Sequence, residues 1–451
     1  MKHTGARAAL LAFLLVVTAA CTRDDNTTSG TGESTTTASS GGADDARALE
    51  NGGFGNLEAV CRNGDASGAT ATGVTDTEIR VGTVTDKGFV GAQGVNKEMY
   101  DAAVAFVAWC NEHGGVLGRR LVVDDLDAAL LEYETRVTEA CEQDFALVGG
   151  GAVFDEDPNN ARVGCGLPNL PAFVVSEPGR TADLQVQPVP NPLAETSLGR
   201  YLAAKRDFPD GIAHYAIMAA NVPSVLLVRD QLVAAAEAQG YTVDYSVVYA
   251  PQGETGWANF VAEMQAKDIK ILEYVGPPSE LVQLNLAMDT AGWELDVLMV
   301  GGNVYDATYA EEAADIAPNL YIQTQYHPFE LAADNKATQD YLDVMATYNP
   351  SGKVALLGAQ AMSAYLLFAK AATECGSELT VQCLLDKAAA QDPWTGGGLH
   401  AEQTPSNDTP SPCFLLLSLG PDGFSYNEEA TQPTAGLYNC DPDNVMAFSG
   451  G

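Results

Sequence analysis

The stretch NEHGGVLGRRLVVDDLDA, Asn111 to Ala128, joins the end of one predicted helix to the start of a strand. Apolar residues recur at helical spacing over 95–112, which predicts the helix. Gly114 and Gly115 end it, as glycine commonly does. The segment 120–124 that follows has the composition of a strand. This junction is one step in an alternation of helices and strands.

The alternation continues on both sides of the junction. EIRVGTV, Glu78 to Val84, predicts a strand before the helix, and the glycine-rich segment 86–94 predicts a loop between the two. After the junction come a helix at 132–143, a strand at 145–148 that ends in three glycines, and a further strand at 172–175.

The same rhythm resumes in the second half, after proline-rich sequence between Pro188 and Pro209. The predicted strands of this half are at 214–218, 243–249, 269–274 and 297–300, and its predicted helices are at 225–239, 257–266 and 279–292. The chain then continues with helices at 354–373 and 380–391 and a strand at 414–419. Repeated strand–helix alternation predicts parallel sheets covered by helices on both faces, so we expect two α/β lobes.

The length of the chain agrees with two lobes, and its net charge limits the classes of molecule that it can bind. The chain has 451 residues, more than one typical domain of roughly 100–200 residues. Its 60 acidic residues against 23 basic ones give a net charge of -37. Such a surface repels nucleic acid and anionic lipid headgroups. We therefore expect no nucleic-acid partner.

The first 20 residues have the layout of a secretory signal peptide. Lys2 and Arg7 are basic, Ala8–Val17 is apolar, and small residues lead into Cys21. The apolar run is too short to span a membrane, which takes about 20 residues. The cysteine directly after small residues resembles a bacterial lipobox, which implies cleavage before Cys21 and a lipid on its sulfur. Simple secretion without a lipid is the alternative.

Residues 22–55 are rich in Ser, Thr, Gly and Asp and poor in large apolar side chains. Such sequence cannot bury enough surface to offset the entropy of ordering it. We therefore predict a flexible tether over 21–72, which would attach the lobes to the membrane through the lipid anchor alone.

Eight cysteines remain besides Cys21, out of nine. Export leads to an oxidising compartment in which disulfides persist. Eight cysteines allow roughly a hundred pairings, so the connectivity stays open. The local pairing that we favour is Cys61–Cys110, Cys141–Cys165, Cys375–Cys383 and Cys413–Cys440. The sequence has no CxxC pair and no zinc-finger spacing, so we expect no metal and no cofactor.

The ordered set of segments resembles the solute-binding proteins of branched-chain amino acid and amide transporters, which are type I periplasmic-binding proteins. The resembling segments are GVTDTEIRVGTV (73–84), the junction 111–128, TEACEQDFALVGG (138–150), LPNLPAFVVSEP (167–178), LVQLNLAMDTAGWELDVLMVGG (281–302) and the helices over 354–383. The resemblance covers most of 73–423, and GGVLGR at 114–119 is its most specific piece.

This resemblance implies two Rossmann-like lobes with parallel sheets, joined by a hinge of three crossovers. We place the crossovers near Pro190, near 323–328 and near 393–398. The expected division is a signal peptide at 1–20, the tether at 21–72, lobe 1 at 73–192 and 329–392, lobe 2 at 193–328 and 393–430, and a tail at 431–451.

Ligands bind beyond the carboxyl ends of parallel strands, so the candidate contacts follow the predicted strands. The expected ligand-binding residues are Asp86, Lys87, Phe89, Gln93, Gly151, Ala152, Val153, Phe154, Ser176, Arg180, Asn221, Tyr274, Asn303 and Tyr326. Glycines at 149–151 would let backbone N–H groups approach a ligand. The alternative for each aromatic residue is core packing, and for Arg180 a solvated surface charge.

The ligand predicted from these positions differs from a free amino acid. The resemblance implies Ser and Thr hydroxyls after the strand at 145–148 to hold an α-carboxylate, and an acidic residue to meet the α-ammonium group. Here the first positions read Ala152, Val153 and Phe154, and the acidic position reads Asn303. The aromatic candidates instead favour a less polar or aromatic ligand. Arg180 keeps an anionic ligand as a second alternative.

The resemblance implies an extracytoplasmic solute-binding lipoprotein of an ABC importer, working as a monomer with a small solute and the permease subunits as partners. A sensing lipoprotein that informs a receptor through the same cleft is one alternative. A scaffold with a filled cleft, used in adhesion, is another. The five histidines lie in no recognisable nucleophile motif, so we expect no enzymatic activity.

Overall fold

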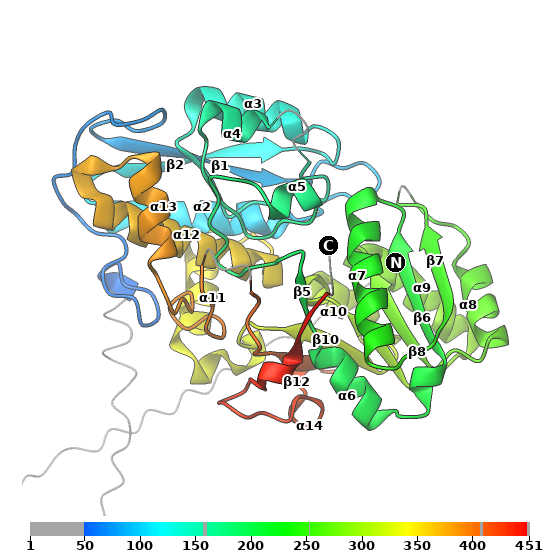
Figure 1. Cartoon of the computed structure of the whole chain (residues 1–451). Coiled ribbons are helices and arrows are strands. Elements are labelled where there is room, and N and C mark those ends of the chain that lie inside the picture. Colours follow the sequence, from blue (N-terminus) through cyan, green and yellow to red (C-terminus); the bar gives the residue numbers. More distant parts are fainter. Residues whose placement is uncertain (1–48, 157–159, 252, 406–408, 449–451) are drawn as a thin grey trace, which may run out of the picture. The chain divides into compact units, whose positions relative to one another are not determined.

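Two separate sheets, one parallel and one mixed, with helices on both sides form the core of the chain (Figure 1). The computed structural model describes residues 49–156, 160–251, 253–405 and 409–448. All of them belong to one compact unit, Gly42–Gly451. The predicted signal peptide, Cys21 and the first part of the predicted tether lie outside the described residues.

The sheet of lobe 1 is parallel throughout. Its strands, in spatial order, are β2 (Arg120–Asp127), β1 (Glu78–Thr85), β3 (Ala146–Val148) and β4 (Asn169–Leu170). Its helices are α2 (Lys97–Glu112), α3 (Tyr133–Gln143), α4 (Ala161–Cys165), α5 (Glu177–Arg180), α11 (Lys336–Tyr348), α12 (Leu356–Cys375) and α13 (Val381–Ala389). In Figure 1, α3 and α4 lie above this sheet, and α2 and α12 lie below it.

The sheet of lobe 2 is longer and mixed. Its strands, in spatial order, are β12 (Gly423–Tyr426), β11 (Leu415–Gly420), β10 (Leu320–Thr324), β9 (Val297–Val300), β8 (Ile271–Val275), β6 (Tyr215–Ala220) and β7 (Val243–Tyr249). The β10–β11 and β11–β12 pairs are antiparallel, and the other pairs of this sheet are parallel. Its helices are α6 (Gly199–Asp207), α7 (Pro223–Ala238), α8 (Trp257–Ala266), α9 (Pro278–Ala291), α10 (Ala307–Ala313) and α14 (Glu428–Thr431).

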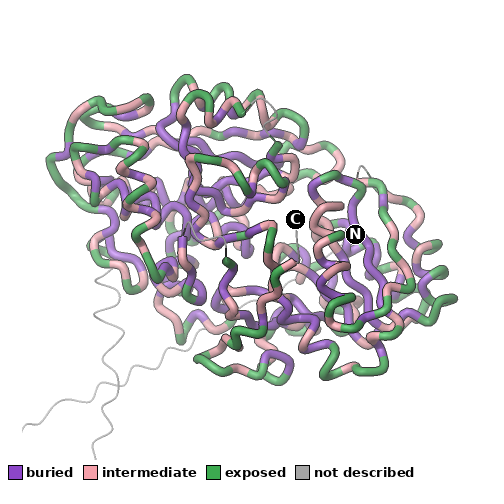
Figure 2. Tube along the Cα trace, in the orientation of Figure 1, coloured by how far each residue is buried: buried purple, intermediate pink, exposed green. Residues whose placement is uncertain are grey.

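The continuous apolar sequence of β6 explains why helices cover both faces of this sheet. Tyr215 and Ile217 pack in one core with α6 and α7. Ala216 and Met218 point the other way and pack with α8 and α9. Successive side chains of a strand face opposite sides of the sheet. A strand that is apolar at every position must therefore be covered on both faces. Figure 2 shows this burial along the strands of lobe 2.

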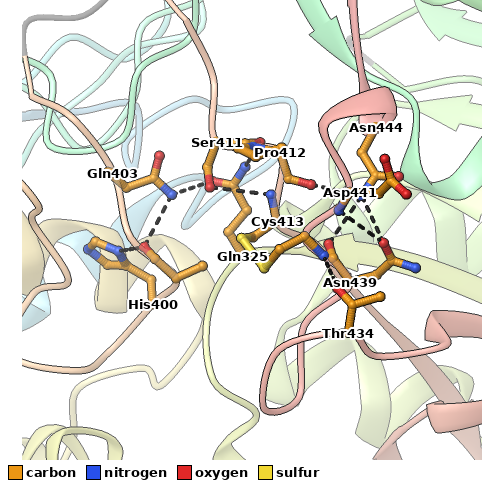
Figure 3. The surroundings of a disulfide bond; sticks show 12 residues. Gln325, His400, Gln403, Ser411, Pro412, Cys413, Thr434, Asn439, Asp441 and Asn444 are labelled. Carbon is orange, nitrogen blue, oxygen red and sulfur yellow. Dashed lines mark hydrogen bonds between the residues drawn. A yellow bond between two sulfur atoms is a disulfide. The ribbon is translucent and has the colours of Figure 1, made fainter.

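The chain passes between the lobes three times, close to the predicted crossovers. The first passage contains β5 (Glu195–Ser197), which pairs with β13 (Val445–Ala447). The second and third run side by side: the His327 amide donates to the Leu399 carbonyl at 2.8 Å, and the Ala401 amide donates to the Gln325 carbonyl at 2.9 Å. Figure 3 shows Gln325 and Gln403 of these two passages near the disulfide of Cys413.

The structure contains all four of the disulfide pairs that we favoured. The tether, by contrast, ends earlier than predicted. Phe54 is fully buried with its ring centroid 6.1 Å from that of Trp109, and the Gly55 amide donates to Asp340 at 2.8 Å. The polar composition of the segment predicted a longer tether than the structure has. A few apolar residues and the disulfide of Cys61 are enough to fix 49–72 on lobe 1. Within the described residues, no helix is long and apolar enough to cross a membrane.

Candidate functional site

A cavity of about 650 Å³ lies between the two lobes, beyond the carboxyl ends of several strands. Its volume corresponds to roughly twenty water molecules of liquid and falls among pockets that hold drug-sized ligands. Lobe 1 contributes the loop after β1, the start of α2 and part of α12. Lobe 2 contributes the start of α7, the turn between β8 and α9, and α10. A solute in this cavity would contact both lobes.

Most of the cavity wall is apolar. On lobe 1 the apolar lining is Phe89, Ala92, Val95, Leu130, Val153, Phe173, Val175 and Leu357. On lobe 2 it is Ala220, Val222, Val225, Val228, Pro251, Val275, Pro277, Pro278 and Val282. Aliphatic side chains dominate both sets. Transfer of apolar solute surface from water to such a wall is favourable by roughly 25 cal/mol per Å².

A small ionic cluster also lines the cavity. The Lys353 ammonium forms an ion pair with Asp306 and lies 3.4 Å from Oε2 of Glu98. Burial raises the pKa of the Glu98 carboxyl, although Lys353 opposes this. Burial lowers the pKa of Lys353, but the two carboxylates raise it above its ordinary value. The cluster joins α2 of lobe 1 to the start of α10 in lobe 2.

Two hydrogen bonds connect lobe 1 to α7 beside the cavity. The Ser224 hydroxyl donates to the Val153 carbonyl at 2.5 Å, and Arg180 donates to the side-chain oxygen of Gln231 at 2.8 Å. Val153 lines the cavity, so the first bond fixes part of its wall. These contacts hold the lobes together around the cavity. An open cavity also contradicts the alternative of a scaffold whose cleft is filled by its own side chains.

Residues 187–423 match the family model for the periplasmic binding proteins. The chain belongs to the periplasmic binding protein family. The members of this family are substrate-binding proteins rather than enzymes. A search of curated proteins finds no match.

Solved structures with the same fold include three solute-binding proteins. The leucine-binding protein of Thermotoga maritima is 13% identical, with a TM-score of 0.64 over 77% of this chain and 97% of that chain. A fatty acid ABC transporter substrate-binding protein from Thermomonospora curvata is 13% identical, with a TM-score of 0.64 over 84% and 97%. A solute-binding protein from Rhodopseudomonas palustris, solved with 3,4-dihydroxybenzoic acid, is 13% identical, with a TM-score of 0.61 over 78% and 95%. They confirm the predicted two-lobed fold class.

Four of the predicted contact residues of this periplasmic binding protein line the cavity: Phe89, Gln93, Val153 and Asn303. Phe89 and Val153 add to the apolar wall. The Asn303 side chain donates to the Gly276 carbonyl at 2.9 Å, which holds the turn after β8 in place. Their contact with a ligand stays a prediction.

The aromatic candidates Phe154, Tyr274 and Tyr326 lie outside the cavity lining. Tyr274 is buried, donates to the Pro277 carbonyl at 2.9 Å, and stacks on Tyr249 with ring centroids 5.8 Å apart. Tyr326 is buried against His400, and Phe154 packs against the main core. Strand alternation explains the position of Tyr274, because Val275, the next residue of β8, faces the cavity instead.

Two polar candidates of lobe 1, Asp86 and Ser176, support loops around the cavity without lining it. Buried Asp86 accepts the amides of Leu130 at 2.8 Å and Val153 at 2.7 Å, and burial raises its pKa to about 6. Ser176 caps α5, where it accepts the Gly179 amide at 3.0 Å.

The remaining candidates also lie outside the lining. Lys87 pairs with Asp125, and Arg180 is engaged with Gln231. Asn221 is exposed, whereas Ala152 is buried in a small core of lobe 1.

The glycine triplet at 149–151 lies outside the cavity lining. The Gly151 amide donates to the Val84 carbonyl at 3.0 Å. A Cβ on Gly151 would lie 2.8 Å from the Phe173 ring, and one on Gly150 would collide with the Val84 backbone. These glycines allow close packing of neighbouring segments.

Sequence reasoning missed the polar lining residues Asn96, Glu98, Lys353 and Gln360. One signal for Glu98 was present. It lies three residues after Val95 and four before Ala102, so a carboxylate occupies the apolar stripe of the predicted helix. A charged residue at such a position must find a polar partner when the stripe is buried.

Proposed function

We propose that this protein captures a small, largely apolar solute between its lobes and delivers it to the permease of an ABC importer. The observation that supports this most is the 650 Å³ cavity, whose wall is mainly aliphatic and comes from both lobes. Residues of two lobes around one solute allow binding to favour the closed arrangement, which a partner can recognise. The predicted signal peptide and Cys21 support an extracytoplasmic protein that a lipid holds at the membrane.

The lining argues for a solute other than a free amino acid. The position expected to supply a hydroxyl to an α-carboxylate contributes the aliphatic side chain of Val153. Asn303 stands where an acidic partner for the ammonium group was expected, and its amide nitrogen is engaged with Gly276. Structural relatives are named for leucine, for fatty acids and for an aromatic acid, so the fold accommodates solutes with apolar bodies.

A thermal-shift screen of the mature protein tests this function. The panel contains amino acids, amides, medium-chain alkyl compounds and small aromatic compounds. A bound solute at a hundredfold excess over its Kd stabilises the fold by about 2.7 kcal/mol, which raises Tm by several degrees. We expect such a rise with apolar solutes and little with small polar amino acids. A panel in which only polar amino acids raise Tm would contradict the proposal.

Val225→Asp is expected to weaken binding of the best solute roughly 100-fold, because the new carboxylate would lose water against an apolar ligand. Val225 lies on α7, is half-buried and lines the cavity. Val248→Asp is the matched control, since Val248 is 37% exposed on β7 and outside the lining. Isothermal titration calorimetry measures both. Equal affinities for the two variants would show that the solute does not bind in this cavity.

A further inference from the structure

Three polar side chains of lobe 1 face the cavity with unsatisfied atoms. Nδ2 of Asn96, Oε2 of Glu98 and Oε1 of Gln360 are buried and make no hydrogen bond within the described residues. Glu98 is the most buried of the three, at 2% exposed. Buried polar atoms normally have a hydrogen-bond partner, and leaving one unpaired costs about 1–3 kcal/mol. Their convergence on one cavity points to a polar group of the solute.

The charge around these atoms favours a cation over an anion. The charged lining residues are three carboxylates, Glu98, Asp306 and Glu312, against two ammonium groups, Lys97 and Lys353. Both ammonium groups are already engaged, Lys97 with Asp101 and Lys353 with Asp306 and Glu98. A carboxylate of the solute would meet like charges at short range, whereas an ammonium group would find acceptors.

Glu98 can receive a second cation because Lys353 does not satisfy it. Lys353 lies 3.4 Å from Oε2 of Glu98, longer than a charge-assisted hydrogen bond of about 2.7–2.9 Å, while its closer partner is Asp306. The backbone amide of Lys353 donates to Asp101 at 2.8 Å, which fixes the loop that carries it. The side-chain oxygen Oε1 of Gln360 lies on the same lobe and is a further acceptor for an ammonium group.

We propose that the cavity selects a solute with a hydrocarbon body and an ammonium head, the body against the aliphatic wall and the head at the acceptor oxygens of Glu98 and Gln360. This rests on the proposed function, since it requires that the cavity captures a solute. It gives that solute a class: an amphipathic amine rather than a fatty acid or a free amino acid.

Matched probes that differ only in the head test the class. The full chain is titrated calorimetrically at pH 7 with octylamine, octan-1-ol and octanoate, and with the corresponding 4-phenylbutyl compounds. We expect the amine to bind at least tenfold more tightly than the carboxylate on at least one body, with the alcohol between them. A carboxylate that binds as well as the amine would overturn the ammonium head but leave the proposed function standing. No binding by any probe would count against both.

Glu98→Gln tests the assigned residue. The substitution keeps the shape and removes the charge, and Lys353 keeps its partner Asp306. We expect the amine to lose at least tenfold in affinity and the alcohol less than threefold. Glu311→Gln is the matched control, because Glu311 is exposed on α10 and outside the lining, and its affinities should equal those of the wild type. Equal losses for amine and alcohol in Glu98→Gln would refute the role of the charge. If that variant fails to fold, the ranking of the probes on the wild type still decides the proposal.

Discussion

Replacing Arg200 by leucine is expected to lower the free energy of unfolding by about 3–5 kcal/mol. The Arg200 guanidinium lies 2.6 Å from Oε1 of Glu273, whose side chain is 1% exposed. Tyr201 and Tyr215 donate to the other oxygen of Glu273, at 2.7 and 2.5 Å. Without Arg200, two neutral hydroxyl groups would be left to stabilise a carboxylate in the core of lobe 2. Urea denaturation followed by circular dichroism measures the loss.

The double variant Arg200→Leu, Glu273→Leu distinguishes the charge interaction between the two residues from the packing of the Arg200 side chain. Replacing a buried ion pair by apolar residues is often nearly neutral, so we expect the double variant to recover most of the lost stability. Two single losses that simply add in the double variant would show that Arg200 acts through packing rather than through the charge of Glu273.

This ion pair also supports the cavity. Glu273 lies in β8, and Val275 and Gly276 that follow it line the cavity. Arg200 begins α6 on the opposite side of the sheet from α9, and its amide donates to Gln323 of β10 at 2.8 Å. The pair therefore anchors α6 to β8, whose end forms part of the wall, and its loss should weaken solute binding as well as folding.

The sequence predicted the architecture because two properties of this fold are local. Strands such as β6 are apolar at every position, and each is followed by a helix, so both sheets and their coverage follow from the pattern. The antiparallel pairing of β11 with β10 follows from a return of the chain after the third crossover, which no local pattern records.

The site was predicted less well, for two physical reasons. A position near a strand end does not give the direction of a side chain, and a one-residue step separates Tyr274 in the core from Val275 at the cavity. The polar cluster is assembled from distant segments: Glu98 comes from α2, Asp306 from lobe 2, and Lys353 from the segment that returns to lobe 1 after the second crossover. Only the three-dimensional fold brings these residues together.

Acid is expected to destabilise the protein through His400, in the third crossover. Its ring is fully enclosed: Nε2 lies 2.8 Å from the Ser363 hydroxyl, and Nδ1 lies 2.8 Å from the Ala401 carbonyl. Ser363 also accepts the Trp394 indole N–H at 2.9 Å. A neutral ring fits this network, with Nδ1–H donating to Ala401 and Nε2 accepting from Ser363. Burial lowers the pKa of His400 to about 4.

The unfolded chain has a histidine pKa of about 6.5, so between pH 6.5 and 4 it binds a proton that the folded chain excludes. The stability that the neutral ring provides is therefore present above pH 6.5 and falls as the pH drops, by about 2 kcal/mol at pH 5 and about 3 kcal/mol at pH 4. Urea denaturation of the wild type and His400→Gln at pH 7, 5 and 4 isolates this contribution as their difference, which should shrink by these amounts. His214→Gln, at a histidine whose side chain is 40% exposed, is the control for the loss of an imidazole. If the unfolding free energy of His400→Gln falls with pH in parallel with that of the wild type, His400 does not cause the acid sensitivity. The contact between the second and third crossovers, which meet at this ring, would then be independent of its charge.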